Sequence, residues 1–432
     1  MFKTTFKGGI HTKDQKGSTI NKAIVELPQP KIVIIPLLQH YDNICTALVK
    51  VGDQVSAGQK IGDCPDIFSA PVHAPISGMV KSIDKYPHPL GTTIDAIVIE
   101  NDGENKNTNT SNPNTNIDNL SKEDIIKAVR EAGIVGLGGA TFPTHIKLNP
   151  PKDKTIDTII INGCECEPYA TCDYRLMIEQ PDKIISGINI VRKLIPAGNI
   201  YIGVEDNKPD AISALQKISG DIKVIPLKTK YPQGGEKMLI KAITKREVPS
   251  GGLPHDVGVS VFNVGTIAAI HDALMGKKPL TKRVVTVTGS GINQPQNVLA
   301  YIGTPIEEVL DFCGGLKEDI NKVIMGGPMM GWPQHNLSAP VIKATTALLC
   351  LTADETKILK IYPCIKCGKC MDNCPTYLMP TRIASFAQFE KCDEFIEYGG
   401  KDCIECGGCA YGCPSHIPLV QFIKLGKLKF KK

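Results

Sequence analysis

The sequence predicts a multidomain α/β protein, and three observations support that fold class. Short β segments separated by turns occupy residues 30–100. Buried strands then alternate with helices over roughly 150 residues, as in a doubly wound sheet. Near the C-terminus, two cysteine runs repeat the spacing C-x2-C-x2-C-x3-C-P. A chain of 432 residues has room for about three or four domains of ordinary size.

The composition is that of an ordinary globular protein, with 42% hydrophobic and 22% charged residues. The net charge of +5 is too small to indicate a nucleic-acid partner. No apolar run approaches the ~18 residues of a membrane-spanning helix. The N-terminus MFKTTFKGGI lacks the apolar core of a secretion signal, so we expect the chain in the cytoplasm. Cysteines outside metal sites should be thiols there.

The first domain is predicted to cover residues 1–100. Its segments VKVGDQVSAGQKIGD (49–63) and SAPVHAPISGMVKSI (69–83) resemble the two halves of a biotinyl/lipoyl-type barrel–sandwich hybrid domain. In that family a carrier lysine lies on the hairpin between the halves. Here that segment is CPDIFSAPV (64–72), which contains no lysine. We therefore expect a structural or docking module and no swinging arm.

A polar linker and then an α/β domain are predicted next. Residues 101–120 are rich in Asn and Thr and contain too few apolar side chains to order themselves. The α/β domain is assigned to residues 121–280, and Ser121 with Asp124 forms a capping-box start for its first helix. Ligands of a Rossmann-like, doubly wound domain bind at the carboxyl ends of its strands. Those strands are predicted at 158–161, 200–204, 222–227 and 257–263.

Four loops of this domain carry candidate binding residues. Closely spaced glycines let backbone N–H groups approach a phosphate or a planar ring. The loops resemble four motifs of the FMN-binding subunit of respiratory complex I: G-x-G-G-A-x-F-P-T-x-x-K, N-x-D-E-x-E-P, Y-x-x-G-E-E and V-N-N-V-E-T. In this chain they read GLGGATFPTHIK (136–147), NGCECEP (162–168), YPQGGE (231–236) and VFNVGT (261–266).

The resemblance implies an FMN site and an adjoining NAD(H) site. The residues expected at FMN are Gly136, Gly138, Gly139, Lys147, Asn162, Glu165, Asn263 and Thr266. The residues expected at NAD(H) are Phe142, Glu167 and Glu236. Carboxylates suit ribose hydroxyls and a carboxamide, and a lysine offsets negative charge near the flavin or its phosphate. The chain departs from the family at Cys164, Gly235 and Phe262, which puts individual contacts in question.

An alternative remains open for the second of these loops. Cys164, Cys166 and Cys172 form a C-x-C-x5-C pattern that could hold a metal ion. No fourth ligand lies nearby in the sequence, and Glu165 between the cysteines is already expected at the flavin. We therefore favour the flavin site over a metal site here.

Residues 281–345 resemble the ubiquitin-like β-grasp (SLBB-like) domain that accompanies the flavin domain in complex I-type proteins. The segments VVTVTGSG (284–291) and VIMGGPMMG (323–331) carry this resemblance. A ferredoxin-like helical domain is assigned to residues 355–420, with a helical pattern over 381–398. Residues 421–432 alternate apolar residues and lysines, and we expect a basic tail there.

The two cysteine runs match the ligand pattern of a bacterial ferredoxin with two [4Fe–4S] clusters. Three thiolates spaced two residues apart can bind three irons of one cluster, and the fourth, before a proline, reaches the other cluster. One cluster is assigned to Cys364, Cys367, Cys370 and Cys413, and the other to Cys403, Cys406, Cys409 and Cys374. A zinc site would use only four ligands in two C-x2-C pairs. A disulfide framework suits small secreted chains.

The order of domains resembles that of the RnfC family, from the Rnf complex, over essentially the whole chain. The resemblance implies a peripheral protein on the cytoplasmic face of a membrane complex that passes electrons between ferredoxin and NAD while moving Na+ or H+. Its partners would be the membrane and ferredoxin-like Rnf subunits and NAD(H). FMN would join hydride exchange to single-electron exchange at the clusters.

Two alternatives stay open at this point. One is a soluble flavin and iron–sulfur enzyme that resembles the same family, such as a cobalamin reductase. The other is a cluster-only electron-transfer scaffold in which the flavin site is vestigial. Flavin content and the response of the flavin to NADH would separate them.

Overall fold

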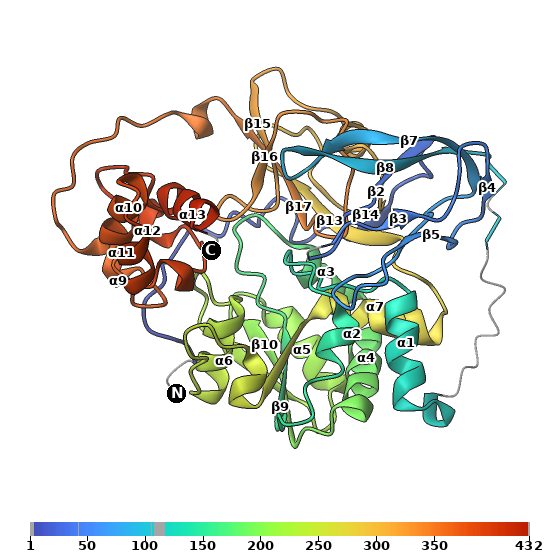
Figure 1. The fold of residues 1–432 in the computed structure, drawn as a ribbon, viewed down its shortest axis with the longest axis horizontal. Coiled ribbons are helices and arrows are strands. Elements are labelled where there is room, and N and C mark those ends of the chain that lie inside the picture. The colour runs from blue at the N-terminus through green and yellow to red at the C-terminus, as the bar shows by residue number, and fades with distance from the viewer. Residues whose placement is uncertain (1–3, 42, 105, 108–116, 431–432) are drawn as a thin grey trace.

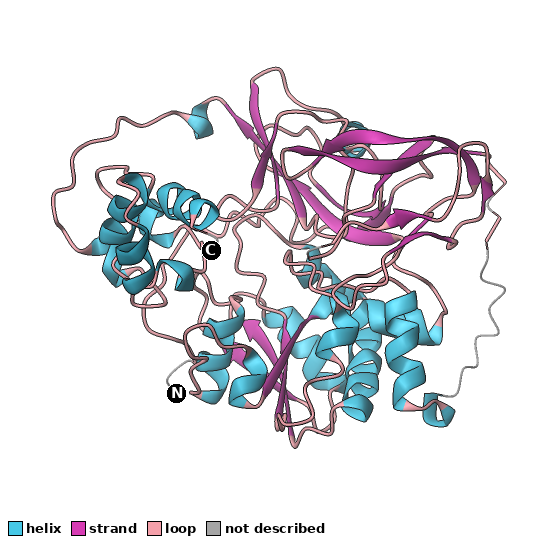
Figure 2. Cartoon of the chain, in the orientation of Figure 1, coloured by secondary structure: helices cyan, strands magenta, loops and turns pink. Residues whose placement is uncertain are grey.

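The computed structural model describes residues 4–41, 43–104, 106–107 and 117–430. A β-rich half lies above an α/β half, and a small helical module lies beside both (Figure 1). Strands are confined to the first two regions, and the module contains helices and loops (Figure 2). The predicted multidomain α/β fold class is confirmed.

The barrel–sandwich hybrid domain consists of two small sheets. One sheet has the order β2-β8-β7-β4, and the other has the order β3-β5-β6. The segment 64–71 connects strands β5 and β6 of the second sheet, carries no lysine and docks on the α/β domain through Ala70. The strands are β2 (Ile32–Pro36), β3 (Thr46–Ala47), β4 (Gln54–Val55), β5 (Lys60–Asp63), β6 (Val72–His73), β7 (Gly78–His88) and β8 (Thr92–Asn101).

Ion pairs and hydrogen bonds hold β5 and the start of this segment against the first helix of the α/β domain, α1 (Lys122–Glu131). The Arg130 guanidinium donates to Asp63 at 3.0 Å and to the carbonyl of Cys64 at 2.8 Å. Lys60 donates to Glu131 at 2.6 Å. The position that carries a lysine in carrier domains is therefore used here for docking within the chain. Of the predicted linker, residues 105 and 108–116 lie outside the described part, and η1 (Ile117–Asn119) follows them.

The α/β domain is built on a parallel sheet with the order β11-β10-β9-β12. The chain fills β9, β10 and β11 outward and then returns to the other side of β9. The order therefore reverses between β9 and β12, where Asn162 pairs with Asn263 at the carboxyl ends. Its strands are β9 (Thr158–Asn162), β10 (Asn199–Glu205), β11 (Lys223–Leu227) and β12 (Val259–Asn263).

Helices cover this sheet, and apolar positions at helical spacing explain which faces they bury. In α4 (Pro181–Leu194), Ile184, Ile188 and Val191 are buried at spacings of three and four residues. The remaining elements are α2 (Thr144–Lys147), α3 (Cys172–Glu179), α5 (Pro209–Ile218), α6 (Glu236–Thr244), η2 (Pro254–Val257) and α7 (Val264–Met275).

The third region is a six-stranded sheet with the order β1-β14-β13-β17-β15-β16. Its edge strand β1 comes from the N-terminal segment, because Ile24 pairs with Asn297 in a parallel ladder. Residues at the start of the assigned 1–100 domain thus lie outside the hybrid fold. The elements are β1 (Ile24–Glu26), β13 (Lys282–Thr288), β14 (Gln296–Tyr301), α8 (Ile306–Phe312), β15 (Ile320–Met325), β16 (Trp332–Gln334), β17 (Ala347–Thr352) and η3 (Asp354–Thr356).

The helical module differs from the sequence-based description in two places. The helical pattern over 381–398 forms two helices, separated where Glu390 takes a φ of +58°. Residues 421–429, assigned to a basic tail, belong to a helix whose Ile423 and Gly426 are buried. Gly426 lies against the Phe395 ring, so apolar packing orders this end. The elements are α9 (Lys369–Asp372), α10 (Pro380–Gln388), α11 (Cys392–Glu397), η4 (Gly400–Asp402), α12 (Gly408–Tyr411) and α13 (Leu419–Lys429).

Residues 4–20, which we call the N-terminal strap, join the three regions. Ile10 forms a β-bridge with Tyr231 of the α/β domain, and the Gly9 amide donates to Asn373 of the helical module at 3.1 Å. Thr19 accepts from Thr171 at 2.7 Å, next to the six-stranded sheet. The strap therefore fixes the helical module against the carboxyl ends of the parallel strands.

Candidate functional site

Two hydrogen bonds of the Leu137 backbone hold the glycine loop, which contains Gly136, Gly138 and Gly139. The Leu137 amide donates to the buried Thr266 hydroxyl at 2.9 Å, and its carbonyl accepts from Arg283 at 3.4 Å. Residues 138–140 are exposed, so their backbone is open to a ligand. Gly139 has a φ of +108°, and a Cβ built there would meet no atom within 4 Å. Thr266 therefore positions the loop through the protein itself.

Two asparagines occupy the point where the strand order reverses. Asn263 caps α7, because its Oδ1 accepts from the Gly265 amide at 2.8 Å, and its Nδ2 donates to Asp173 at 2.6 Å. Asn162 donates to the carbonyl of Gly234 at 2.8 Å. Doubly wound sheets bind ligands outside the strand ends at such a reversal. The glycine loop, β9 and β12 meet here.

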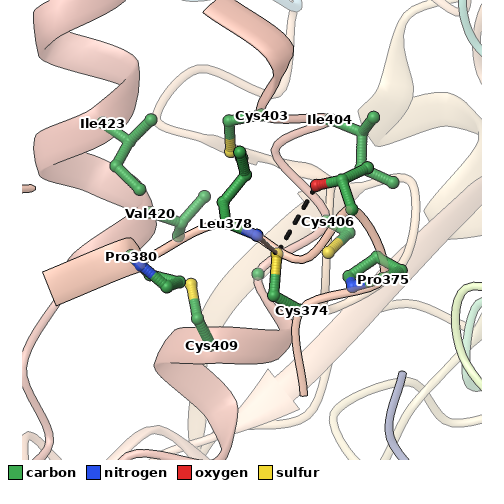
Figure 3. A pocket seen from close by; sticks show the side chains of 12 residues that line it. Cys374, Pro375, Leu378, Pro380, Cys403, Ile404, Cys406, Cys409, Val420 and Ile423 are labelled. Carbon is green, nitrogen blue, oxygen red and sulfur yellow. Dashed lines mark hydrogen bonds between the residues drawn. The ribbon is translucent and has the colours of Figure 1, made fainter. Parts of the chain in front are cut away.

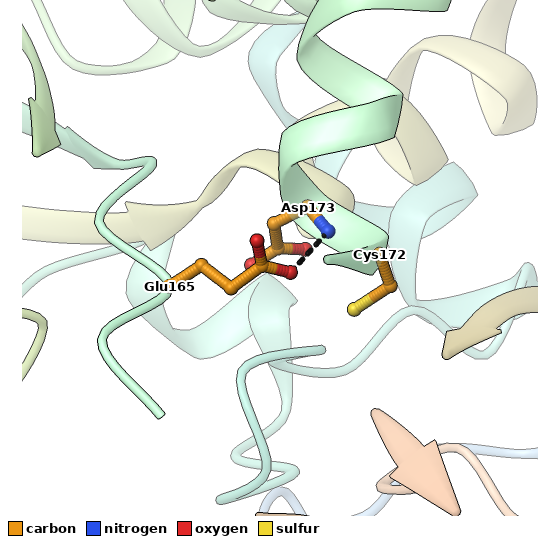
Figure 4. A group of neighbouring side chains, drawn as sticks. All are labelled: Glu165, Cys172 and Asp173. Atoms are coloured by element: carbon orange, nitrogen blue, oxygen red, sulfur yellow. Dashed lines mark hydrogen bonds between the residues drawn. The ribbon is translucent and has the colours of Figure 1, made fainter. Parts of the chain in front are cut away.

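Glu165 lies over the N-terminus of α3 (Figure 4). Its carboxylate accepts from the Asp173 amide at 2.7 Å and from the Tyr174 amide at 3.2 Å, where a helix favours negative charge. Burial, with the Glu165 charge beside it, raises the pKa of Asp173 to about 7. Glu165 therefore caps this end of α3.

The three cysteines of the C-x-C-x5-C pattern do not come together. Within the described residues, the group whose ligand atoms all lie within 4.8 Å of one another is Glu165, Cys172 and Asp173. Cys164 points to the carbonyl of Gly203 at 3.7 Å, and Cys166 accepts from the Gly234 amide at 3.3 Å. The structure therefore does not gather these three sulfurs around a single ion.

Lys147, expected at FMN, and Glu236, expected at NAD(H), form an ion pair at 2.8 Å. Lys147 also donates to the carbonyl of Val261 at 3.2 Å. The Lys147 and Glu236 side chains retain 31% and 39% of their exposure, so both remain open to a ligand. The two loops that carry them thus face a shared space.

Glu167 binds the loop between β15 and β16 of the β-grasp region. Its carboxylate accepts from the Met330 amide at 2.9 Å and the Met329 amide at 3.2 Å. Burial raises the pKa of Glu167 to about 7, and the two amides oppose that rise. This residue therefore couples the loop after β9 to the neighbouring domain.

Two buried lysines, which the sequence analysis did not single out, support the same loop. Lys16 of the strap donates to the carbonyls of Glu165 and Glu167 at 3.0 and 2.9 Å. Lys208 donates to the carbonyl of Cys164 at 2.7 Å and pairs with the buried Glu205 at 3.1 Å. Burial lowers the pKa of Lys16. Burial would also lower that of Lys208, but Glu205 and other nearby negative charges outweigh it and raise the pKa.

Phe142 lies beside two aromatic rings of the hybrid domain. Its ring centroid is 6.3 Å from that of Tyr41 and 6.2 Å from that of Phe68. The Tyr41 amide donates to the carbonyl of Thr141 at 3.2 Å, which fixes the two domains at this point. Aromatic side chains of the hybrid domain therefore flank the glycine loop.

These loops fit FMN. Exposed backbone at residues 138–140, an open Gly139 and the partly exposed Lys147 offer donors and positive charge. They adjoin the reversal in strand order, where a bound phosphate and planar ring are expected. Other predicted contacts, such as Thr266 and Glu165, bind the protein and shape the cradle.

The eight cysteines of the repeat line two separate pockets. The first, which we call the inner site, is lined by Cys374, Cys403, Cys406 and Cys409 (Figure 3). The second, which we call the outer site, is lined by Cys364, Cys367, Cys370 and Cys413. In each pocket three cysteines come from one run and the fourth comes from the other.

The spacing of the eight sulfurs does not fit a single tetrahedral zinc ion. Tetrahedral zinc, with Zn–S of about 2.3 Å, would place its sulfurs about 3.8 Å apart. Among the described residues, no three of the eight sulfurs lie within 4.8 Å of one another. Backbone amides of Lys366, Leu378 and Glu405 point to cysteine sulfurs at 3.4 Å, which is the kind of contact that tunes iron–sulfur clusters.

Models of four domain families match the chain in order. They are the RnfC barrel sandwich hybrid domain at residues 4–104, the Nuo51 FMN-binding domain at 129–272, the SLBB domain at 284–333 and the 4Fe-4S dicluster domain at 358–415. The chain therefore carries an FMN-binding domain and a 4Fe-4S dicluster domain. No described helix has the length and apolar character needed to span a bilayer.

Similar proteins extend over nearly the whole chain. The chain is 46% identical to the C subunit of the proton-translocating ferredoxin:NAD(+) oxidoreductase complex of Clostridium ljungdahlii, over 89% of this chain and 84% of that protein. It is also 46% identical to the Na(+)-translocating counterpart of Acetobacterium woodii, over 90% and 89%. An NAD+-reducing [NiFe]-hydrogenase structure shares the fold, with a TM-score of 0.52 at 18% identity over 70% of this chain and 61% of that one. The chain belongs to the RnfC family of the ion-translocating ferredoxin:NAD(+) oxidoreductase complexes, as the sequence analysis predicted.

Proposed function

We propose that the chain is the electron-transfer subunit that exchanges hydride with NAD(H) at FMN and single electrons through two [4Fe–4S] clusters. It would do so within an ion-translocating ferredoxin:NAD(+) oxidoreductase complex, as a peripheral subunit on the cytoplasmic face. Two of its relatives are named as parts of proton- and Na(+)-translocating complexes.

One observation carries the proposal. The helical module contains two pockets, each lined by four cysteines. The strap fixes this module beside the carboxyl ends of the parallel strands, where the glycine loop also lies. A hydride delivers two electrons together, and each cluster accepts one. FMN supplies the conversion between the two when it is bound. A protein that only passed single electrons between clusters would not require the candidate FMN site.

The residues of the flavin end have distinct proposed roles. Lys147 would offset negative charge on the bound flavin, and the backbone at Gly136, Gly138 and Gly139 would approach its phosphate or ring. Phe142 and Glu236 would contact NAD(H), with Glu236 released from Lys147 to accept from a hydroxyl or carboxamide. Asn162, Glu165, Asn263 and Thr266 would orient the loops, and Glu167 would act on NAD(H) only indirectly through its loop.

At the other end, the eight cysteines would be the cluster ligands. The inner site would hold one cluster and the outer site the other, each with a fourth thiolate from the opposite run. Thiolates are the usual ligands of [4Fe–4S] clusters, and nearby amides lower the cost of the negative charge.

The test is anaerobic purification of the full chain, loaded with FMN and iron, followed by mixing with NADH. We expect NADH to bleach the flavin absorbance, and Lys147→Ala to reduce FMN content while iron stays at about eight atoms per chain. Lys152→Ala, at an exposed lysine five residues away, is the matched control. A chain that binds no FMN and does not respond to NADH would be a cluster-only scaffold, and the proposal would fail.

A further inference from the structure

The inner site lies on the side of the helical module that faces the α/β domain. Cys406 packs in one buried apolar cluster with Ile10 of the strap and Tyr231 of the third flavin loop. A Cβ at Gly407 would lie 3.2 Å from the carbonyl of Met329 in the β-grasp region. The inner site therefore lies against the strap, the α/β domain and the β-grasp region.

A continuous set of contacts joins the inner site to the flavin loops. Tyr231, only 1% exposed, packs with Cys406 and with Cys166, which lies in the loop after β9. Cys166 accepts from the Gly234 amide at 3.3 Å, and the Gly234 carbonyl accepts from Asn162 at 2.8 Å. Asn162 stands at the reversal in strand order, beside the predicted flavin. The inner site is thus connected to the flavin cradle through packed protein groups.

The outer site, in contrast to the inner site, is exposed to solvent. Cys364 and Cys367 are exposed, as is every residue from 357 to 367. This segment belongs to the long connection that arcs from β17 to α9 (Figure 1). Ile358 is 99% exposed and Ile365 is 67% exposed. Large apolar side chains this exposed around a redox site are typical of a contact surface.

Residues 357–369 contain four lysines and no acidic residue. Lys360, Lys366 and Lys369 form no ion pair with any described residue, whereas Lys357 pairs with Asp354. Lys360 lies over the Tyr362 ring at 5.4 Å. The nearest acidic residues along the chain, besides Asp354, are Glu355 and Asp372. Unpaired lysines around an exposed redox site would attract an acidic partner.

We propose that the two cluster sites work in a fixed order: the inner site exchanges electrons with the flavin, and the outer site exchanges them with an acidic protein that docks on residues 357–369. This inference rests on the proposed function. Each transfer moves one electron, so the partner's centre is oxidised as the outer cluster is reduced, and no bond forms or breaks. An anionic membrane could also bind lysines and apolar side chains, but it cannot deliver an electron to the exposed cysteines.

The first experiment tests the docking surface with a small acidic two-[4Fe–4S] ferredoxin as the probe. The reduced ferredoxin is mixed with the FMN- and iron-loaded full chain, and its oxidation is followed by stopped flow at low salt. Charge reversal at Lys360, Lys366 and Lys369 to glutamate should slow the bimolecular rate at least about tenfold and abolish its salt dependence. Charge reversal at the exposed Lys127, Lys152 and Lys217 of the α/β domain is the matched control and should leave the rate unchanged.

An equal effect of both triple variants would overturn the docking surface, because net charge alone would then explain the rate. Loss of binding to phosphatidylglycerol vesicles, with ferredoxin oxidation unchanged, would show that the surface binds a membrane. Both results contradict the proposal.

The second experiment tests the order of the sites in single turnovers with the same ferredoxin and NAD+. A Cys403→Ser/Cys406→Ser variant, with the outer site intact, should oxidise about one equivalent of ferredoxin in a burst and form no NADH. A Cys364→Ser/Cys367→Ser variant should show no burst. The reverse pattern would overturn the order. If either variant loses both clusters, as iron analysis would reveal, the lysine variants still test the outer surface.

Failure of this inference is distinguishable from failure of the proposed function. NADH bleaching of the flavin requires neither cluster order nor the lysine surface. A chain whose flavin responds to NADH but whose lysine variants oxidise ferredoxin normally would keep the proposed function and lose this inference.

Discussion

The helical module and the flavin loops use their sequence motifs differently. In the module, all eight motif cysteines line the two pockets, in the sets that their spacing predicts. In the flavin loops, several motif residues bind the protein: Thr266 holds Leu137, Glu165 caps α3, and Glu167 binds Met329 and Met330. A cluster takes its ligands from two short segments, so their spacing determines the site. A flavin cradle is assembled from four distant loops that must first be held in place.

The largest effect on stability is expected from breaking the buried ion pair of Lys208 and Glu205. Lys208→Met leaves the Glu205 carboxylate buried and unpaired, which we expect to cost about 3–5 kcal/mol. The α/β domain should lose thermal stability and FMN, while iron content is retained because the module has its own apolar core. The measurement is the apparent unfolding midpoint together with FMN and iron per chain.

The matched control is Lys208→Met/Glu205→Gln, which removes the unpaired charge and keeps an acceptor for the Lys230 amide. It should recover part of the lost stability. Loss of iron in parallel with FMN in the single variant would show that the two regions do not differ as proposed.

An intermediate effect is expected at the bond that holds the glycine loop. Thr266→Val keeps the shape of the side chain but leaves the buried Leu137 amide without its acceptor, at a cost of about 1–3 kcal/mol. FMN affinity, measured by fluorescence titration, should fall, with cluster spectra unchanged. Thr266→Ser retains the hydroxyl and should bind FMN nearly as the wild type does. Unchanged FMN binding in Thr266→Val would mean that the loop needs no such support.

The smallest effect should come from pH at Glu167. Burial raises its folded pKa to about 7 from 4.5, so the protonated form is the more stable one in the fold. Protonated Glu167 therefore contributes fully to the stability of this contact below the ordinary carboxyl pKa. That contribution is lost as pH rises through the folded pKa. Hydrogen exchange of the Met329 and Met330 amides should therefore speed up between about pH 5 and about pH 8 beyond the intrinsic increase.

Glu167→Gln removes this titration, so the excess pH dependence should disappear in that variant. The matched control is Glu247→Gln, at an exposed glutamate of the α/β domain, which should leave the wild-type dependence intact. A Glu167→Gln chain with the wild-type pH dependence would contradict the assignment.

Much of the fold could be predicted from local sequence. The apolar runs at 158–161 and 200–204 are strands of one parallel sheet, and Ser121 with Asp124 caps α1 as a capping box. The strap could not be predicted, because residues 4–20 have no periodic pattern and derive their structure from distant partners such as Tyr231 and Asn373. The helix at the C-terminus was missed because lysines obscured the buried face that contains Ile423.

The sequence by itself determined the two cysteine sets, the order of the domains and the four flavin loops, because each depends on spacing within a short segment. Only the tertiary structure decided that Lys147 pairs with Glu236, that Lys16 and Lys208 support the loop after β9, and that the three cysteines of that loop lie apart. It also decided which cysteine site faces the α/β domain, since both runs have the same spacing. Burial and contact between distant segments are not encoded in spacing, so these features appear only when the chain is folded.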